Sequence, residues 1–182
     1  MDLTEHPLHS EIMAAGDLLT VKRDLVSLPN GNTSYREYVA HPGAVVVVPM
    51  LSNGHVVLER QFRYPLRQVF VELPAGKIDP NEETLQTGKR ELLEETGYTA
   101  RQWVKLGRQH PCIGYSDEVI HIYLATDLQL GSHRRDEDES LEVFDVSFAD
   151  CLSMIVQGEI TDSKTITAIF LAEKYLQANG GN

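Results

Sequence analysis

The sequence predicts an α/β protein, and three observations support this fold class. Short runs rich in β-branched residues fill much of the first half of the 182-residue chain, as in the apolar stretch 43–51. A helical pattern occupies the middle, at 82–96, and two more close the chain. A chain of this length can bury one sizeable core. We therefore expect one α/β domain over residues 43–182, preceded by an N-terminal β-hairpin extension within residues 1–42.

The first half of the chain is expected to form strands joined by tight turns. Asn30-Gly31 is a strong hairpin signal, and Ser52-Asn53-Gly54 predicts a second hairpin. The stretch 43–51 has less than half of the roughly 20 apolar residues that a membrane helix needs, so it is expected to be a buried strand. The predicted strands are 18–28, 33–40, 44–51, 55–63 and 68–73.

The second half is expected to alternate between helices and strands. The middle helix should begin after Asn81 as its N-cap and end at Gly97 in the left-handed conformation. Leu85, Gly88 and Leu92 form its stripe facing the core. Further strands are predicted at 103–109, 118–126 and 142–148, and the closing helices at 148–157 and 165–177.

Charge and cysteine content exclude several classes of protein. The net charge of −11 opposes binding to the phosphate backbone, so no nucleic acid polymer is expected as a partner. Cys112 and Cys151 are too few for a disulfide framework or a Cys-x-x-Cys metal site, and both are interpreted as reduced structural thiols. The first twenty residues contain no apolar signal region, and no stretch is long enough to span a membrane. We expect a cytoplasmic protein.

The middle helix carries an unusual cluster of like charges. Glu91, Glu94 and Glu95 share one part of its surface, and carboxylates at this spacing repel one another. Glutamates that decorate an exposed helix would explain an arbitrary pattern of this kind. A bound cation would also explain it, and hard oxygen ligands favour Mg²⁺, or alternatively Mn²⁺, over zinc.

The spacing within residues 76–98 resembles the Nudix box. That pattern runs from a glycine through a glutamate to Arg-Glu-apolar-x-Glu-Glu-x-Gly-apolar, and no defining position is missing here. The match is therefore specific, and it covers 23 residues directly. The matching residues are Gly76, Glu82, Arg90, Glu91, Leu92, Glu94, Glu95, Gly97 and Tyr98.

The resemblance implies a Nudix fold, an α/β/α sandwich around a mixed sheet, and hydrolysis of a nucleoside diphosphate linked to another moiety. It also implies that Glu91 and Glu95 are the principal Mg²⁺ ligands, joined by Glu94 and by the backbone carbonyl of Ala75. Glu94 and Glu95 count among the catalytic residues for the same reason. The supporting residues that it implies are Gly76, Glu82 for the loop, and Arg90 for orienting the glutamates.

Segments outside the box resemble the ADP-ribose pyrophosphatase branch of the family. In "RQFRYP" and "VELPAGKI", Arg63 and Glu72 match substrate-binding positions, and Arg60 is a weaker candidate. A charged strand edge is the alternative for the arginines. "DEDESLEV" resembles the acidic loop that supplies a catalytic carboxylate, with Glu139 as the first candidate and Glu137 as the second. A solvated loop is the alternative interpretation of that segment.

The resemblance leaves the substrate open. "PCIGYSDE" places Ile113 where this branch often has proline. ADP-ribose, cleaved to AMP and ribose 5-phosphate, is the favoured substrate; GDP-mannose or another nucleotide sugar is the alternative. A non-catalytic Nudix-like ligand sensor is an alternative of another class. Relatives in this branch form dimers with exchanged N-terminal strands, so we expect a homodimer assembled through residues 1–42.

Overall fold

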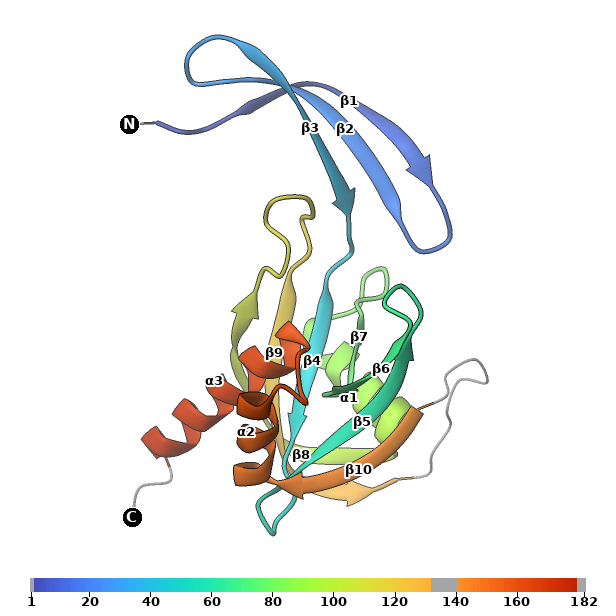
Figure 1. Ribbon diagram of the computed structural model, residues 1–182, viewed down its shortest axis with the longest axis vertical. Helices are drawn as coiled ribbons and strands as arrows, with labels where there is room; N and C mark the ends of the chain where they lie inside the picture. Colours follow the sequence, from blue (N-terminus) through green and yellow to red (C-terminus); the bar gives the residue numbers. More distant parts are fainter. Residues whose placement is uncertain (1, 132–140, 180–182) are drawn as a thin grey trace. The chain divides into compact units, whose positions relative to one another are not determined.

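The computed structural model describes residues 2–131 and 141–179 (Figure 1). Contacts within the chain divide it into two compact units. The first contains residues 1–43 together with 110–119, and the second contains 44–109 together with 120–182. The inclusion of 110–119 in the N-terminal unit was not predicted from the sequence.

The N-terminal unit is a three-stranded antiparallel sheet in the order β1-β2-β3. The expected hairpin is confirmed: β2 (Thr20–Ser27) pairs with β3 (Thr33–Ala40), and Gly31 in the turn has a φ of 85°. The sequence did not predict β1 (His6–Ala15). All ten residues of β1 are exposed, so it lacks the alternation of apolar and polar residues that reveals a strand with one buried face.

Residues 110–119 join this unit through backbone contacts with the end of β3. Val39 and Ser116 form a parallel bridge, and the Val39 amide donates to the Tyr115 carbonyl at 2.9 Å. The carboxylate of Asp117 accepts the His41 amide at 2.7 Å. These contacts hold a loop that is distant in sequence against the last strand of the extension.

The second unit contains two sheets and three helices among its described residues. One sheet has the order β7-β4-β9-β8, with β4 and β9 parallel and the other pairs antiparallel; the other sheet has the order β10-β5-β6 and is antiparallel. Its elements are β4 (Ala44–Pro49), β5 (His55–Arg63), β6 (Gln68–Glu72), β7 (Ala75–Lys77), α1 (Thr84–Thr96), β8 (Tyr98–Gln109), β9 (Ile120–Leu130), β10 (Leu141–Ser147), α2 (Phe148–Gln157) and α3 (Ser163–Asn179).

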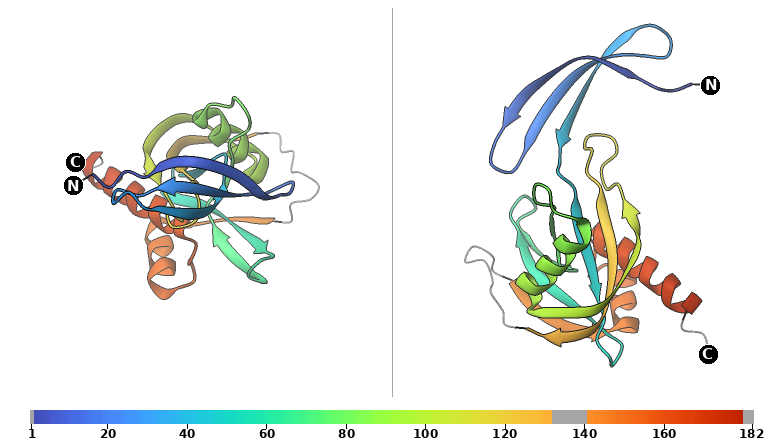
Figure 2. Two further views of the ribbon diagram at one scale, coloured as in Figure 1. Left: turned by 90° about the horizontal axis from the view of Figure 1, so that it is seen from above. Right: turned by 180° about the vertical axis from the view of Figure 1, so that it is seen from behind.

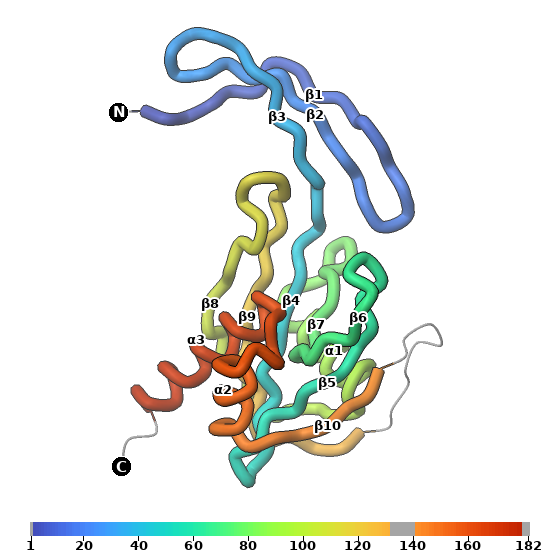
Figure 3. The backbone as a smooth tube through the Cα atoms, in the orientation of Figure 1, coloured from blue at the N-terminus to red at the C-terminus, as the bar shows by residue number. Residues whose placement is uncertain are grey.

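The prediction of a second hairpin was wrong. β4 and β5 belong to different sheets, and between them there is one bridge, from Met50 to Val56. Gly54, with a φ of 80°, turns the chain as expected, but β5 then pairs along its length with β10 and β6 (Figure 3). A turn signal indicates a reversal of the chain, whereas the choice of neighbouring strand depends on contacts with distant segments.

The central strand β4 explains how helices cover both faces of the mixed sheet. Its six residues are all buried, and successive side chains of a strand point to opposite faces. Val45 and Val47 belong to the cluster with Leu92 of α1, while Val46 and Val48 belong to the cluster with residues of α2 and α3. Figure 1 shows α2 and α3 in front of β4 and β9, and the reverse view in Figure 2 shows α1 on the other side. The α/β/α arrangement therefore follows from one apolar strand.

The three helices are confirmed, with small differences at their ends. α2 has the predicted bounds, α3 extends two residues further at each end, and α1 begins at Thr84 instead of residue 82. The short strand β7 was not predicted, because three residues give no periodic signal. Within the described part of the chain, every helix is too short or too polar to cross a membrane.

Candidate active site

The glutamate-rich segment 76–98 passes from strand β7 through a loop into α1. The prediction that Asn81 caps this helix was wrong: Asn81 lies in the loop with a φ of 64°, and Glu83 occupies the N-cap position without a side-chain cap. The end of the helix was predicted correctly. Gly97 has a φ of 77°, and its amide donates to the Leu93 carbonyl at 2.9 Å.

Helix α1 approaches the sheet closely because Gly88 lies at the contact. A Cβ atom at Gly88 would lie 3.2 Å from Val45 and 3.4 Å from Trp103. This close packing turns part of the acidic surface inward: Glu91 is 9% exposed and Glu95 is 4% exposed. Buried carboxylates require compensating partners, so the surroundings of these two residues determine what the site can do.

Arg90 supplies positive charge within the acidic cluster. Its guanidinium donates to both carboxylate oxygens of Glu82, at 3.1 and 3.0 Å, and to Glu91 Oε1 at 2.7 Å. It also donates to Glu94 Oε2 at 3.0 Å and to the Lys77 carbonyl at 3.1 Å. The hydrogen bonds that Arg90 donates to Glu82 are the largest cause of its raised pKa, and the negative charge of Glu91 adds to them. The guanidinium therefore links the loop, the helix and the end of β7.

Glu82 is held in its charged form at the end of this loop, just before α1. The hydrogen bonds from Arg90 lower its pKa to about 2, against the cost of burial. The Thr87 hydroxyl donates to Glu82 Oε2 at 2.8 Å, and the Asp79 amide donates to the same oxygen at 3.3 Å. Glu82 thus joins the loop to α1, because it accepts hydrogen bonds from Asp79 in the loop and from Thr87 and Arg90 in the helix.

Gly76 makes room for the carboxylate of Glu91. A Cβ atom at Gly76 would lie 1.8 Å from Glu91 Oε1 and 2.0 Å from its Cδ. Both distances are too short for non-bonded atoms, so the Glu91 carboxylate would have to move. The requirement for glycine here is therefore steric. The absence of a side chain at Gly76 lets the Glu91 carboxylate of α1 lie directly against the backbone of β7.

Glu95 and Ala75 form a second connection between α1 and β7. The Ala75 amide donates to Glu95 Oε2 at 2.8 Å. β7 itself pairs antiparallel with β4, where Ala75 lies opposite Val46, and the Val47 amide donates to the Pro74 carbonyl at 3.0 Å. The backbone on which Ala75 presents its carbonyl is therefore held by both the central sheet and the helix.

The donor chemistry of this region fits a hard divalent cation. Carboxylates of α1 lie against the backbone of β7: Glu95 contacts the Ala75 amide, and the space over Gly76 is filled by the Glu91 carboxylate. Among residues 2–131 and 141–179, no three acidic, histidine or cysteine side chains are already arranged as a cation site. Arg90 is the cation that contacts Glu91 and Glu94 in this structure.

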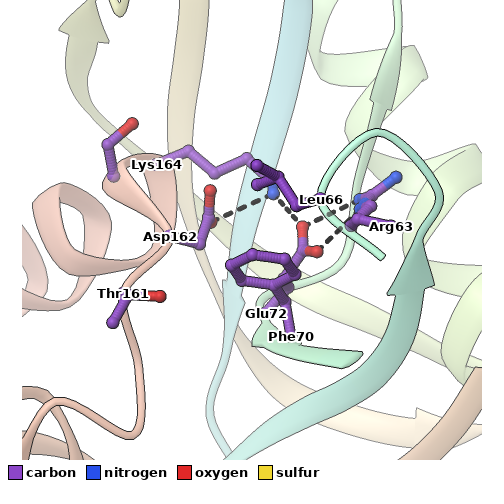
Figure 4. Close-up of a pocket in the computed structure, with 8 residues that line it drawn as sticks. Arg63, Leu66, Phe70, Glu72, Thr161, Asp162 and Lys164 are labelled. Atoms are coloured by element: carbon purple, nitrogen blue, oxygen red, sulfur yellow. Dashed lines mark hydrogen bonds and ion pairs between the residues drawn. The ribbon is translucent and has the colours of Figure 1, made fainter. Parts of the chain in front are cut away.

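A cavity of about 340 Å³ opens in the same unit, between the β5–β6 hairpin and the start of α3 (Figure 4). Leu66 and Phe70 form its apolar wall, and charged and hydroxyl side chains line the rest. A cavity of this size that combines an apolar wall with convergent polar groups is typical of a small-molecule site. The lining residues are Arg63, Leu66, Phe70, Glu72, Thr161, Asp162, Ser163 and Lys164.

Arg63, Glu72 and Lys164 form a compact ion-pair network in this cavity. Arg63 donates from Nε to Glu72 Oε1 at 2.7 Å and from Nη2 to Oε2 at 2.8 Å, and the Lys164 ammonium also donates to Oε2. Burial would raise the pKa of Glu72, but the Arg63 hydrogen bonds and the Lys164 charge outweigh it, so the pKa is lowered. Glu72 is therefore a charged group buried beneath the cavity.

Electrostatic interactions connect the cavity to the glutamates of α1. The pKa of Arg63 is raised, first by its hydrogen bonds to Glu72 and also by the charges of Glu59 and Glu95. Arg63 at the cavity wall therefore experiences the negative charge of a carboxylate of α1.

Comparison with known proteins identifies the family. Residues 40–165 match the NUDIX domain. The chain belongs to this family. The assignment from residues 76–98, here called the Nudix box, is therefore confirmed.

Several proteins of known name or structure resemble the chain over nearly its full length. An ADP-ribose pyrophosphatase of Bacillus subtilis (strain 168) is 40% identical over 96% of this chain and 94% of that protein. A methanol dehydrogenase activator of Bacillus methanolicus is 38% identical over 95% and 92%. The crystal structure of an ADP compounds hydrolase matches with a TM-score of 0.89 at 25% identity, over 99% of this chain and 98% of that chain. The Nudix fold is thereby confirmed.

The candidate residues predicted from the sequence do not all lie at one place in the structure. Arg60 does not line the cavity: its guanidinium contacts Glu142 at 3.2 Å and lies 4.0 Å from the centre of the Phe144 ring, both on β10. Glu137 and Glu139 lie outside the described residues. Arg63 and Glu72 lie together at the cavity, while the carboxylates of Glu91, Glu94 and Glu95 lie together at the Nudix box.

Sequence reasoning missed the contribution of α3 and of Phe70. Phe70 lies two residues before Glu72 on β6, so strand alternation could have placed both on one face. The "TDSKT" segment carries a helix start signal, since Asp162 accepts the Thr165 amide at 3.0 Å. No local pattern, however, indicates that this helix start lies beside Glu72.

Replacing Gly76 with alanine should displace the Glu91 carboxylate. We expect Gly76→Ala to lower kcat by at least about a hundredfold, because a Cβ would occupy the position of Glu91 Oε1. Gly16→Ala is the matched control, since its Cβ would meet no atom closer than 4.0 Å. Steady-state kinetics would measure both variants, and near-normal activity of Gly76→Ala would contradict the proposed role of this close contact.

The depressed pKa of Glu82 predicts a pH-dependent contribution to stability. A folded-state pKa of about 2 against an ordinary value of 4.5 means that the contribution is complete above pH 4.5 and disappears as the pH falls toward 2. We expect the difference in unfolding free energy between wild type and Glu82→Gln to shrink over that range. Urea denaturation at several pH values measures it, with the exposed neighbour variant Glu83→Gln as control. A difference that stays constant with pH would exclude this linkage.

Proposed function

We propose that the protein hydrolyses the pyrophosphate bond of a nucleoside diphosphate sugar, with ADP-ribose as the favoured substrate and AMP and ribose 5-phosphate as products. The observation that carries this proposal is the intact Nudix box beside an arginine-lined cavity in the same unit. The 40% identity to an ADP-ribose pyrophosphatase over nearly the whole chain supports the choice of substrate.

Glu91, Glu95 and the Ala75 carbonyl would hold a divalent cation, with Glu94 as a further ligand. Hard oxygen donors favour Mg²⁺, and Mn²⁺ is an alternative. When bound, the cation supplies neutralisation of the pyrophosphate charge and activation of the attacking water. Arg90 already bridges Glu91 and Glu94, so it positions these carboxylates from the side of the loop.

The cavity would receive the rest of the substrate. Arg63 presents a planar guanidinium suited to phosphate oxygens, and it is 41% exposed. Glu72 holds that guanidinium through two parallel hydrogen bonds. Phe70 and Leu66 offer an apolar wall against which a base or a ribose ring can pack.

A loop carboxylate would act as the general base, and Glu139 is proposed ahead of Glu137 for this role. Both lie outside the described residues, so the assignment rests on the resemblance of "DEDESLEV" to the acidic loop of the branch. A base must come within hydrogen-bonding distance of the attacking water. Separate Glu139→Gln and Glu137→Gln variants would decide between the two.

The proposed function also includes assembly through the N-terminal extension. β1 is exposed along its whole length and carries Leu8, Ile12 and Met13. A small sheet with little buried surface of its own gains stability by packing against another chain. We propose a two-fold symmetric homodimer in which residues 1–42 of each chain are exchanged.

Light scattering at micromolar concentration tests the dimer. We expect twice the chain mass of 20.4 kDa for the wild type. An Ile12→Lys variant should shift the equilibrium toward the monomer, because it places a charge on the exposed strand. A wild-type protein that scatters as a monomer would refute the dimer while leaving the hydrolytic proposal intact.

A hydrolysis panel with Mg²⁺ tests the substrate. ADP-ribose should have the highest kcat/KM among ADP-ribose, GDP-mannose, dinucleotides and nucleoside triphosphates. A tenfold preference for GDP-mannose would correspond to about 1.4 kcal/mol of transition-state stabilisation and would replace the ADP-ribose assignment by the alternative. Absence of turnover for every compound would favour the non-catalytic sensor.

Removal of a box carboxylate tests the role of the cation. We expect Glu95→Gln to lower kcat by at least about a hundredfold, because the cation loses a charged ligand. Glu82→Gln should cost less, since Glu82 contacts Arg90 and the loop. Glu83→Gln, an exposed change in the same segment, should retain activity. Full activity of the wild type in EDTA would rule out the dependence on a metal.

A further inference from the structure

Lys164 belongs to the cavity but to no motif of the Nudix box. It lies in the first turn of α3, 92 residues after Glu72, and its ammonium contacts the Glu72 carboxylate. The same ammonium donates to Asp162 Oδ2 at 3.0 Å. Its side chain is 14% exposed, and Figure 4 shows it extending between the two carboxylates.

The position of Lys164 is fixed by the start of its helix. Asp162 Oδ2 accepts the Thr165 amide at 3.0 Å and the Thr165 hydroxyl at 2.7 Å, which anchors the residue that also binds Lys164. The Thr165 hydroxyl oxygen in turn accepts the Leu73 amide at 2.9 Å. The first turn of α3 is therefore tied to the backbone next to Glu72, which places Lys164 beside that carboxylate.

Glu72 is bound by two cations at once. Arg63 Nη2 and Lys164 Nζ both donate to Oε2, and Arg63 Nε donates to Oε1. The carboxylate is 2% exposed, so removal of all its cations would leave a buried, uncompensated charge at a cost of several kcal/mol. One cation of the pair must remain if the other leaves.

The two cations differ in their freedom to leave. Arg63 is 41% exposed at the cavity wall, whereas Lys164 is 14% exposed and is also bound to Asp162. A phosphate in the cavity would offer Arg63 new charge-assisted hydrogen bonds in place of those to Glu72. Glu72 would then depend on Lys164 for its compensation.

We propose that Lys164 is a positioning residue: it keeps Glu72 compensated, so that Arg63 can transfer hydrogen bonds from Glu72 to the pyrophosphate of the substrate. This inference rests on the proposed function, because it takes the ligand of Arg63 to be a nucleotide pyrophosphate. It assigns Lys164 an effect on substrate binding through Arg63, without contact between Lys164 and substrate.

Other charged groups around Glu72 also bear on its ionisation. Glu59 lies opposite it on β5, and the charge of Glu95 acts on Arg63 from α1. Both are negative, so they increase the need for a permanent cation at Glu72. The charged side chains that act on Glu72 or on its two cations include Glu59, Arg63, Glu95, Asp162 and Lys164.

A double-mutant cycle with Lys164→Met and Glu72→Gln tests the proposal through the hydrolysis of ADP-ribose with Mg²⁺. In the wild-type background we expect Lys164→Met to raise KM about tenfold and to change kcat by less than about twofold, because Arg63 stays bound to Glu72. In the Glu72→Gln background it should have no further effect, since a neutral amide needs no counter-ion. A tenfold effect that persists with Gln at position 72 would show direct contact with substrate and overturn the proposal.

The matched control is Lys174→Met, an exposed change on the same helix, which should leave KM unchanged. Urea denaturation establishes that each variant is folded. If Lys164→Met fails to fold, Lys164→Gln removes the charge with a side chain that can still hydrogen-bond to Asp162, and the same outcomes apply. Lys164→Arg keeps the charge and should retain most of the substrate affinity.

A measurement without substrate separates this inference from the proposed function. Carboxyl-carbon NMR titration of Glu72 should show a higher pKa in Lys164→Met than in the wild type, because the carboxylate loses a nearby positive charge. An unchanged titration would overturn the role of Lys164 whatever the substrate is. A wild-type protein that hydrolyses no nucleotide sugar, with the expected NMR result, would refute the function but keep the ionic role of Lys164.

Discussion

The geometry of the Nudix box depends on the hydrogen bonds that the Arg90 guanidinium donates. Carboxylates at adjacent helical positions repel, and two of the box glutamates are nearly buried. Arg90 offsets this repulsion by donating to the loop, to the helix and to the end of β7 at the same time. A lysine could not reproduce the arrangement, since its ammonium lacks the planar set of five donors. The same contacts that stabilise the fold therefore position the carboxylates that we propose as ligands of a divalent cation.

The backbone between β6 and β7 is where the box and the cavity meet. Four consecutive residues, 72–75, each make a contact with a different part of the unit, so the presentation of the Ala75 carbonyl depends on all of them. These contacts fix the backbone positions of residues 72–75, even though they lie next to a loop. The contacts are Glu72 with Arg63 and Lys164, the Leu73 amide with Thr165, the Pro74 carbonyl with Val47 and the Ala75 amide with Glu95.

The errors of sequence reasoning have identifiable physical causes. The turn at Gly54 was predicted, but β4 and β5 separate into two sheets because each finds partners far along the chain: β9 for β4, and β10 for β5. β1 was missed because none of its residues is buried, so burial imposed no pattern on its sequence. Arg60 and Arg63 look equivalent in "RQFRYP", and a substrate-binding role for both stays a prediction, but Arg63 follows three positions after Arg60, so alternation sends their side chains to opposite faces of β5. Arg63 reaches the cavity, and Arg60 packs on Phe144.

The sequence by itself determined the chemistry of the Nudix box. Its glutamates and its arginine lie close together in the sequence, and helical spacing decides that Arg90, Glu91, Glu94 and Glu95 lie on neighbouring parts of one helix surface. The four consecutive valines of β4 likewise determined that one strand would be buried on both faces. Tertiary structure decided what stands beside the box: Lys164 meets Glu72 across 92 residues because α3 packs on the sheet with its first turn next to β6. That contact depends on the packing of whole elements, and no local spacing of residues encodes it.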